Sequence, residues 1–209
     1  MVSGKLSILP LPGDRFDDAV DLLKHAFRDD PIFGFHFPDS NLRAKVLGIF
    51  FSDVIRTHMP FHHVYAAMEG DRLVGAAVWR PPNAGVNGIR DRLRGLVTRS
   101  RLMALSPYVV PKLLRGFAAL EATHPRIPYW YLFFIGVASE QRGRGVGAQL
   151  MAPALQAADT AHVMCYLETP FSQTLPFYRK LGYEISSEPQ PFRGAPHLWT
   201  MTRSPGPEK

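Results

Sequence analysis

Glycines and arginines alternate over one short stretch in the second half of the chain. The residues are Arg142, Gly143, Arg144, Gly145 and Gly147. Because glycine has no side chain, it leaves the neighbouring backbone N–H groups uncovered, and phosphate oxygens can approach them closely. The arginine side chains add full positive charges. The stretch therefore predicts a binding site for an anion such as a diphosphate.

A strand and a helix must position this stretch. The apolar run Leu132–Val137 precedes it and predicts a buried strand. After it, apolar residues recur at helical spacing, namely at Val146, Leu150, Ala154 and Ala158. The N-terminus of that helix would lie at the glycines and add the partial positive charge of the helix dipole.

A dinucleotide-binding loop is one interpretation of this spacing. Gly143, Gly145 and Ala148 formally fit the G-x-G-x-x-G/A pattern of such loops. In that pattern the loop follows its strand at once and belongs to a repeated strand–helix–strand unit. Here five residues separate Val137 from Gly143, and too little chain follows for a second unit. This interpretation is therefore disfavoured.

The order Arg142-x-x-Gly145-x-Gly147 instead resembles the pyrophosphate loop of the GCN5-related N-acetyltransferase (GNAT) superfamily. The strand end Phe134–Val137 is similar to the ELxxV-like strand that precedes this loop in the family. A strand before the loop and a helix after it make the pattern more specific than the glycines alone.

A second stretch strengthens the resemblance. The family carries a helix that ends in FYxKxGF, and Phe177–Tyr183 is similar to it, with Gly182 as the expected helix C-cap. Further segments resemble the branch of puromycin N-acetyltransferase. They include His124-Pro125, Leu167–Thr169 and Trp199–Arg203.

The resemblance implies an α/β fold with a mixed central sheet of about six to seven strands, splayed at the coenzyme site and flanked by helices. It implies acetyl-CoA as the acyl donor. The residues expected to hold the pantetheine amides and the pyrophosphate are Gly136, Val137, Arg142, Gly143, Arg144, Gly145, Val146, Gly147 and Ala148.

Acyl transfer to an amine needs a stabilised oxyanion and a proton donor for the leaving thiolate. In the family, the tyrosine of the second stretch lies beside the coenzyme sulfur. This implies Tyr178 as the general acid, because a phenol can donate a proton to the sulfur. The structural alternative is a core aromatic ring whose hydroxyl reaches solvent.

The general base is less evident. Many family members have a glutamate on the strand before the loop, but residues 130–134 contain no carboxylate. Glu168, at the end of the following strand, is a candidate, although it could equally anchor a loop through backbone N–H groups. His124 and Asp30 are weaker candidates, and a chain of water molecules could also take the proton. No His or Cys cluster has metal-ligand spacing, so no metal is expected.

The composition is that of a globular protein. Of the 209 residues, 46% are hydrophobic and 20% are charged, which excludes a disordered chain. No apolar run reaches the roughly 20 residues that span a bilayer. The N-terminus lacks the apolar core of a signal peptide, so a cytoplasmic protein is expected. The single cysteine, Cys165, excludes an intramolecular disulfide and is expected in the core.

The pattern of hydrophobic residues predicts one domain over residues 1–204, with a helical insertion at about 83–127 and a flexible tail at 205–209. Strands are expected at 5–9, 63–69, 73–79, 129–137, 162–169, 183–187 and 197–202. Helices are expected between Asp14 and Asp30, at 41–58, 146–160 and 174–181, and twice in the insertion. The aromatic segment 32–38 is expected to be a loop, packed on the core or lining an acceptor pocket.

The net charge of +6 suits an acidic partner, either coenzyme A or nucleic acid. The first insertion helix has an apolar stripe at Ile89, Leu93, Leu96 and Val97, and the second has one at Val110, Leu113, Leu114 and Phe117. The first also carries arginines at 90, 92, 94, 99 and 101. A solvated helix face is favoured over a nucleic-acid surface, because no aromatic residues alternate with these arginines.

The sequence thus predicts an acetyl-CoA-dependent N-acetyltransferase that acts on a primary amine of a small molecule, by direct attack in a ternary complex. An aminonucleoside or another amine antibiotic is a candidate acceptor. The alternative is a non-catalytic acyl-CoA-binding sensor or interaction module, because the strand carboxylate is absent. No nucleic acid or membrane partner is expected, and the chain could be a monomer or a homodimer.

Overall fold

The computed structural model describes residues 6–61, 63–82, 89–190 and 194–206. Its centre is a seven-stranded sheet with the order β1-β2-β3-β4-β5-β7-β6. Neighbouring strands are antiparallel, except for β4 and β5, which are parallel. The predicted mixed sheet is therefore confirmed. Lys5 of the first predicted strand, residues 83–88 of the insertion and residues 207–209 of the tail lie outside the described residues.

Most predicted elements are found within about two residues of their expected ends, as is usual for boundaries. The strands are β1 Leu6–Pro10, β2 Val64–Glu69, β3 Arg72–Arg80, β4 Tyr129–Val137, β5 Met164–Thr169, β6 Glu184–Ser187 and β7 Trp199–Arg203. The helices are α1 Phe16–Ala26, α2 Pro31–His36, α3 Ser40–His58, α4 Ile89–Leu105, α5 Val109–Glu121, α6 Val146–Thr160 and α7 Leu175–Lys180.

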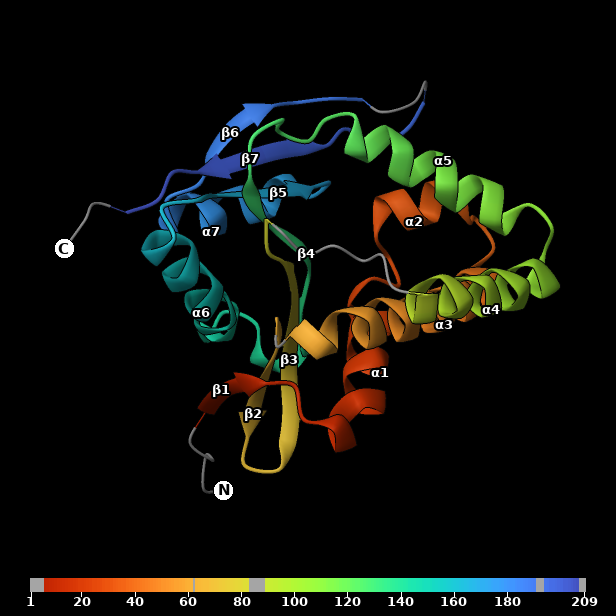
Figure 1. Ribbon diagram of the computed structural model, residues 1–209, viewed down its shortest axis with the longest axis horizontal. Helices are drawn as coiled ribbons and strands as arrows, with labels where there is room; N and C mark the ends of the chain where they lie inside the picture. The colour runs from red at the N-terminus through yellow and green to blue at the C-terminus, as the bar shows by residue number, and fades with distance from the viewer. Residues whose placement is uncertain (1–5, 62, 83–88, 191–193, 207–209) are drawn as a thin grey trace.

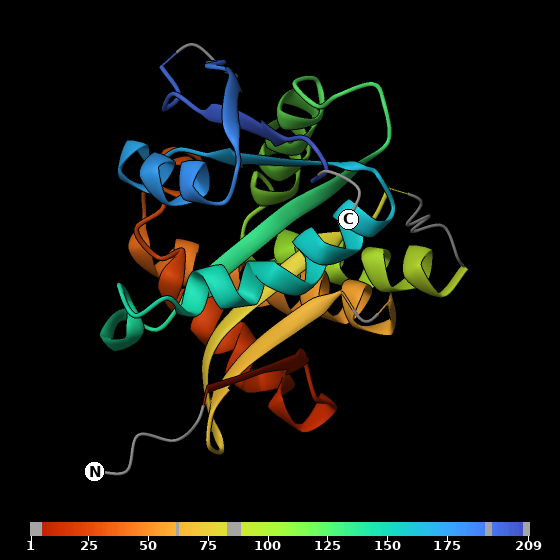
Figure 2. The same cartoon turned by 90° about the vertical axis from the view of Figure 1, so that its left-hand side faces the viewer.

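Helices cover both faces of the sheet. Figure 1 shows the sheet nearly edge-on, with α1 to α5 on its right and α6 on its left. In Figure 2 the molecule is turned, and α6 lies across the central strands. Glycines in the central strands permit this close packing. A Cβ atom at Gly75 of β3 would lie 2.8 Å from Leu150 of α6, and one at Gly136 of β4 would lie 2.9 Å from Leu23 of α1.

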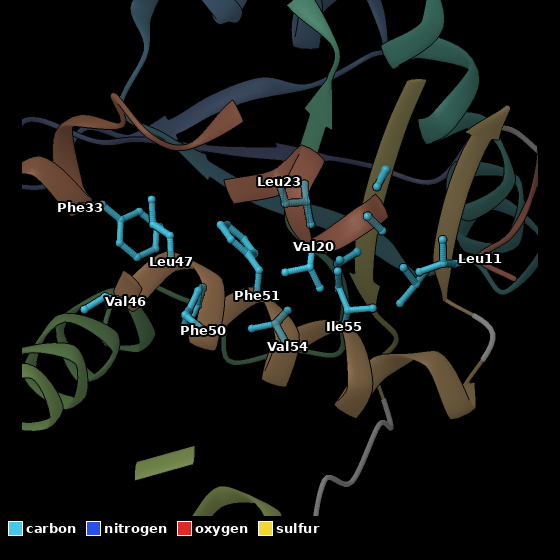
Figure 3. Close-up of a cluster of buried hydrophobic side chains, with 14 of the residues drawn as sticks. Leu11, Val20, Leu23, Phe33, Val46, Leu47, Phe50, Phe51, Val54 and Ile55 are labelled. Atoms are coloured by element: carbon cyan, nitrogen blue, oxygen red, sulfur yellow. The ribbon is translucent and has the colours of Figure 1, made fainter. Parts of the chain in front are cut away.

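The larger core lies between the sheet and the helices α1 and α3. Figure 3 shows their apolar side chains pointing toward one another, among them Leu23, Phe51 and Ile55. The stripe predicted for α1 is confirmed, since Val20 and Leu23 are buried and Phe16 and Phe27 pack against the core. A second core of buried side chains lies beneath α6 and α7.

The aromatic segment predicted as a loop is mostly a helix, so that prediction is wrong. Asp30 caps α2: its side chain accepts hydrogen bonds from the N–H groups of Ile32 (2.9 Å) and Phe33 (3.0 Å). Pro31 occupies the first helical turn, where its missing N–H costs nothing. The pair Asp30-Pro31 therefore starts a helix, in addition to following the end of α1 at Ala26. By contrast, Asp14 does not cap α1; it lies in a short 3-10 turn, Gly13–Arg15.

The insertion forms the two predicted helices, but the apolar stripe predicted for α4 is not buried. Leu93, Leu96 and Val97 are 58%, 63% and 58% exposed, whereas Leu102 of the same helix is buried. The stripe of α5 is largely confirmed, because Val110 is buried and Leu113 and Phe117 pack on the core, although Leu114 is exposed. The side chains of Ile89, Arg90, Arg92 and Arg94 lie outside the described residues.

Asp30 gives the fold a pH dependence. Burial raises the pKa of its carboxyl from 3.8 to about 6, although hydrogen bonds from Phe33 and Ile32 act in the opposite direction. The folded chain therefore holds this proton more tightly than the unfolded chain does. The contribution of Asp30 to the free energy of unfolding falls as pH rises from about 4 to about 6, by up to about 1.4 kcal/mol per pH unit.

Asp30→Asn should remove this dependence, because the asparagine oxygen can still cap α2 but the side chain does not ionise. Relative to the unchanged protein, the variant should gain about 2 kcal/mol of stability between pH 4 and pH 7. Denaturant unfolding at several pH values measures the difference. Asp39→Asn, at the exposed cap of α3, is the matched control. Equal slopes for Asp30→Asn and the unchanged protein would contradict the prediction.

Candidate active site

The two central strands β4 and β5 separate halfway along their length. They pair at Tyr129 with Met164, Trp130 with Cys165 and Tyr131 with Tyr166, and no further. We call the remaining segments, 132–137 of β4 and 167–169 of β5, the β4–β5 divergence. Phe133, Phe134, Ile135 and Val137 are half-exposed, although they belong to a central strand with helices on both faces. The sheet is therefore splayed, as the sequence predicted.

A β-bulge at Phe133 decides which backbone groups face this divergence. The pairing of β4 with β3 shifts there, from Trp79–Leu132 to Val78–Phe134. Beyond the bulge, the Ala138 N–H donates to the Val74 carbonyl of β3. Because an antiparallel ladder alternates, the N–H and C=O groups of Ile135 and Val137 point away from β3, toward β5.

Gly136, which the sequence analysis placed with Val137 among the cofactor-binding residues, has a different position. Its backbone N–H and C=O groups point toward Ala76 of β3. A Cβ atom there would lie 2.9 Å from Leu23 and 3.0 Å from Ala26 of α1. Gly136 thus permits α1 to pack closely. Ile135, which the sequence analysis did not name, lies beside Val137 on the diverging edge.

The glycine loop leads directly into α6. Gly143 and Gly145 have φ angles of +77° and +81°, a left-handed conformation that favours glycine, and a Cβ atom at either position would point into open space. Gly145 is the N-cap of α6. Within the described part of the chain, no acceptor bonds the backbone N–H groups of Gly143, Gly145, Val146, Gly147 or Ala148. These amides lie together at a helix N-terminus, a geometry suited to an anion, at the position where the sequence predicts one.

The two arginines of the loop act through their side chains. Their backbone N–H groups donate hydrogen bonds within the loop. That of Arg142 donates to the Ser139 carbonyl (3.3 Å), and that of Arg144 donates to the Gln141 carbonyl (3.4 Å). Both side chains are exposed, and the Arg142 Nε donates to the Val137 carbonyl over 3.4 Å. The positive charges therefore lie between the diverging strand and the helix N-terminus.

Gln141, which the sequence analysis did not single out, connects the loop to β2 through hydrogen bonds. It is only 5% exposed; its Oε1 accepts a hydrogen bond from Arg144 (2.8 Å), and its Nε2 donates to Glu69 of β2 (2.8 Å). The burial of Gln141 comes from the fold, so no sequence pattern singles it out; once buried, its side chain needs hydrogen-bond partners, as buried polar groups normally do.

Tyr178 lies next to this loop. Its neighbour Phe177 contacts the first turn of α6, where a Cβ atom at Gly147 would lie 3.3 Å from the Phe177 ring. The two stretches singled out in the sequence are therefore in contact. Tyr178 is buried, its ring packs against Tyr183 with centroids 6.0 Å apart, and burial raises the pKa of its phenol. The hydroxyl stays protonated at neutral pH, as a proton donor must.

Glu168 belongs to a buried polar cluster on the β4–β5 divergence. Its Oε1 lies 2.7 Å from the His124 Nε2, in a contact without the alignment of a good hydrogen bond. It also interacts with the hydroxyls of Tyr131 and Tyr166, whose pKa values are raised by burial and by the Glu168 charge. The interpretation of Glu168 as a loop anchor is not supported, because its partners are side chains.

His124 adds a second partner to the cluster. Its Nδ1 lies 2.7 Å from the Tyr129 hydroxyl. The structure thus brings together Glu168 and His124, two of the base candidates, and separates them from Asp30, whose carboxylate caps α2. Cys165 is fully buried, and burial raises the pKa of its thiol to about 11, in keeping with the expected core position.

The described residues include neither a cluster of metal ligands nor a membrane-spanning helix. No three His, Cys, Asp or Glu side chains come together there as a metal site would require. No helix in that part of the chain combines the length and the apolarity needed to cross a membrane.

Gly145→Glu tests the anion site. A side chain in the left-handed region costs roughly 1–2 kcal/mol, and the added negative charge repels phosphate. The dissociation constant for coenzyme A should therefore rise at least about tenfold, as measured by calorimetry. Gly13→Glu adds the same charge at a site with free space and an ordinary φ angle, and it should bind normally. Unchanged binding by Gly145→Glu would exclude this loop as the phosphate site.

Comparisons with known proteins agree with this geometry. Residues 107–185 match the family model "Acetyltransferase (GNAT) domain". A Corynebacterium glutamicum structure described as histone acetyltransferase HPA2 and related acetyltransferase has 23% identity and a TM-score of 0.69, over 97% of this chain and 98% of that one.

Two insect enzymes have similar structures. Arylalkylamine N-acetyltransferase 2 from Aedes aegypti has 14% identity and a TM-score of 0.59, over 96% of this chain and 99% of that one. A Drosophila melanogaster polyamine N-acetyltransferase has 15% identity and a TM-score of 0.55, over 96% of this chain and 100% of that one. This chain therefore has the GNAT acetyltransferase fold, and its residues 107–185 carry the sequence pattern of the GNAT acetyltransferase domain.

Proposed function

We propose that this protein transfers the acetyl group of acetyl-CoA to a primary amine of a small molecule, by direct attack in a ternary complex. One observation carries the proposal. The central strand β4 loses its pairing with β5 after Tyr131, and it is followed by a loop of unbonded amides at the N-terminus of α6. An extended pantetheine arm can pair with the free strand edge, while a diphosphate binds the amides.

The coenzyme contacts follow from these two features. The N–H and C=O groups of Ile135 and Val137 would bind the pantetheine amides, and an N–H on the same edge would stabilise the oxyanion. The amides of Gly143, Gly145, Val146, Gly147 and Ala148, with the side chains of Arg142 and Arg144, would bind the pyrophosphate. The thioester would then lie in the β4–β5 divergence.

Glu168 is the proposed general base. Residues 132–137 and 167–169 contain no other ionisable side chain. Tyr131, which interacts with Glu168, packs against Phe133 (5.4 Å between centroids), and Phe133 in turn packs against Phe117 of α5 (6.2 Å). Glu168 therefore serves the face of the sheet that α1 to α5 cover, and the amine acceptor would approach from that face.

Tyr178 is the proposed general acid. It belongs to the second core, beneath α6, and so reaches the divergence from the face opposite to Glu168. A base on one face and an acid on the other suit a reaction in which the amine attacks from one side and the thiolate leaves toward the other. The raised pKa of Tyr178 keeps its proton available for the thiolate.

The acceptor class has support from proteins of the same fold. The names of the similar structures include acetyltransferases for agmatine, polyamines and arylalkylamines, all of which are amines. An aminonucleoside or another amine antibiotic remains a candidate acceptor from the sequence resemblance. The buried carboxylate of Glu168 is chemically suited to any of these ammonium groups.

A screen for thiol release tests the function. The protein is incubated with acetyl-CoA and a panel that contains agmatine, a polyamine, an arylalkylamine, puromycin and other amine antibiotics. Amine-dependent release of free thiol, with an acetylated product in mass spectrometry, is the expected result. Coenzyme binding without thiol release for any amine would favour the alternative, an acyl-CoA-binding module.

Tyr178→Phe should lower kcat by about tenfold to 100-fold and leave the dissociation constant of coenzyme A nearly unchanged, because the hydroxyl acts on the leaving sulfur and not on binding. Steady-state kinetics and calorimetry give the two quantities. Tyr183→Phe is the matched control, since it removes a hydroxyl from the neighbouring buried ring. An equal loss of kcat in both variants would identify a structural effect.

A further inference from the structure

A continuous row of polar groups connects Glu168 with the protein surface. The carboxylate contacts the His124 Nε2 at 2.7 Å, and the His124 Nδ1 contacts the Tyr129 hydroxyl at 2.7 Å. The Glu168 and His124 side chains are 7% and 8% exposed, so water does not reach them freely. Both contacts are short, but the Glu168–His124 pair lacks the alignment of a good hydrogen bond, so a small rotation of either side chain must precede direct proton transfer there.

Tyr129 is the outer end of this row. It is half-buried and lines a surface cavity of about 420 Å³ together with Arg80, Pro125 and Arg126. The row therefore runs from the β4–β5 divergence to a residue that borders this surface cavity. It uses residues from three segments: β5, the connection that follows α5, and the first position of β4.

Other groups around the row hold it in place. Tyr131 and Tyr166 interact with the carboxylate from β4 and β5, and their raised pKa values keep them as neutral donors. The Arg80 guanidinium of β3 lies 5.2 Å from the centre of the Tyr131 ring. Tyr166 is also held by the Thr123 hydroxyl, at 3.0 Å. The carboxylate of Glu168 and the imidazole of His124 are thus enclosed by neutral hydroxyl groups on the side of β4 and β5.

Acetyl transfer to a protonated amine requires such a path. The reaction converts an ammonium ion and acetyl-CoA into an amide, a free thiol and one proton. The nitrogen loses two protons as the C–N bond forms and the C–S bond breaks. One proton is needed by the thiolate, which Tyr178 protonates. The other must leave the enzyme at each turnover.

We propose that Glu168, His124 and Tyr129 form a proton relay that carries this second proton from the acceptor ammonium to solvent. The inference rests on the proposed function. Glu168 takes the proton from the nitrogen and passes it to the His124 Nε2. The imidazolium then releases its Nδ1 proton to the Tyr129 oxygen, while the Tyr129 hydroxyl proton passes to water. This leaves the His124 proton on Nε2, and a half-turn of the imidazole ring restores the starting arrangement for the next turnover. Glu168 is the catalytic residue, and His124 and Tyr129 act through it.

Tyr129→Phe tests the relay, because it removes the outer oxygen and keeps the ring. At pH 7, where an alkylamine is protonated, kcat should fall about tenfold. Near pH 10 roughly a third of the amine is neutral in solution, because the pKa of an alkylamine is about 10.4, and this fraction needs no relay, so the deficit should shrink to about threefold or less. His124→Gln should show a larger loss with the same pH dependence. Both are measured as pH–rate profiles with an acceptor from the thiol-release screen.

Tyr65→Phe on β2, at a half-buried tyrosine outside the row, is the control and should match the unchanged protein at every pH. Thermal melting confirms that the variants fold. A deficit of Tyr129→Phe that is the same at all pH values, or no deficit, would overturn the relay and leave the acetyltransferase function intact. No turnover of any amine by the unchanged protein would overturn both.

Discussion

The separation of β4 from β5 after Tyr131 is the feature on which the site depends. A central strand normally has both rows of its backbone groups bonded to neighbours, because unpaired N–H and C=O groups are costly when buried. Here the bulge at Phe133 turns Ile135 and Val137 toward the side where no strand follows. The same segment is half-exposed. A bound extended molecule can supply the missing hydrogen bonds, and so the sheet itself is an incomplete binding site.

Close packing fixes the other parts of the site relative to this edge. Gly136 lets α1 approach β4 from one face, and Gly75 lets α6 approach β3 from the other. Since α6 is held close to the sheet, its N-terminal amides lie just beyond the end of β4. Gly147 brings α7 against the first turn of α6 through Phe177, and with it Tyr178. Small residues thus set the positions of groups that are far apart in the sequence.

Burying a carboxylate is costly unless it is paired and hydrogen-bonded. Glu168 is surrounded by side chains alone: the His124 imidazole lies 2.7 Å from its carboxylate, and Tyr131 and Tyr166 interact with its charge. Such an arrangement gives little stability that an apolar cluster could not give. The cluster lies at the β4–β5 divergence, which is the position that the proposed role of Glu168 as a base requires.

Local patterns were sufficient for much of the fold and for part of the site. The glycines at 143 and 145, the helix from Val146 and the position of Tyr178 follow from short-range rules of conformation and periodicity, so the sequence determined them. Asp30-Pro31 also contained a local signal for a helix start, which was misinterpreted as a helix end. The exposed stripe of α4 shows the limit of periodicity, because it does not tell whether a partner covers an apolar face.

Only the tertiary structure decided which backbone groups and side chains come into contact. The position of Ile135, and not Gly136, on the diverging edge depends on a bulge in the ladder with β3, and no pattern within β4 reveals that ladder. The contacts of His124 with Glu168 and with Tyr129 form because β4, β5 and the segment after α5 lie side by side in the fold. The sequence by itself determined the glycine loop before α6, since its conformation depends on adjacent residues. The cluster of Glu168, His124 and Tyr129 depends on contacts between distant residues, which only the folded chain creates.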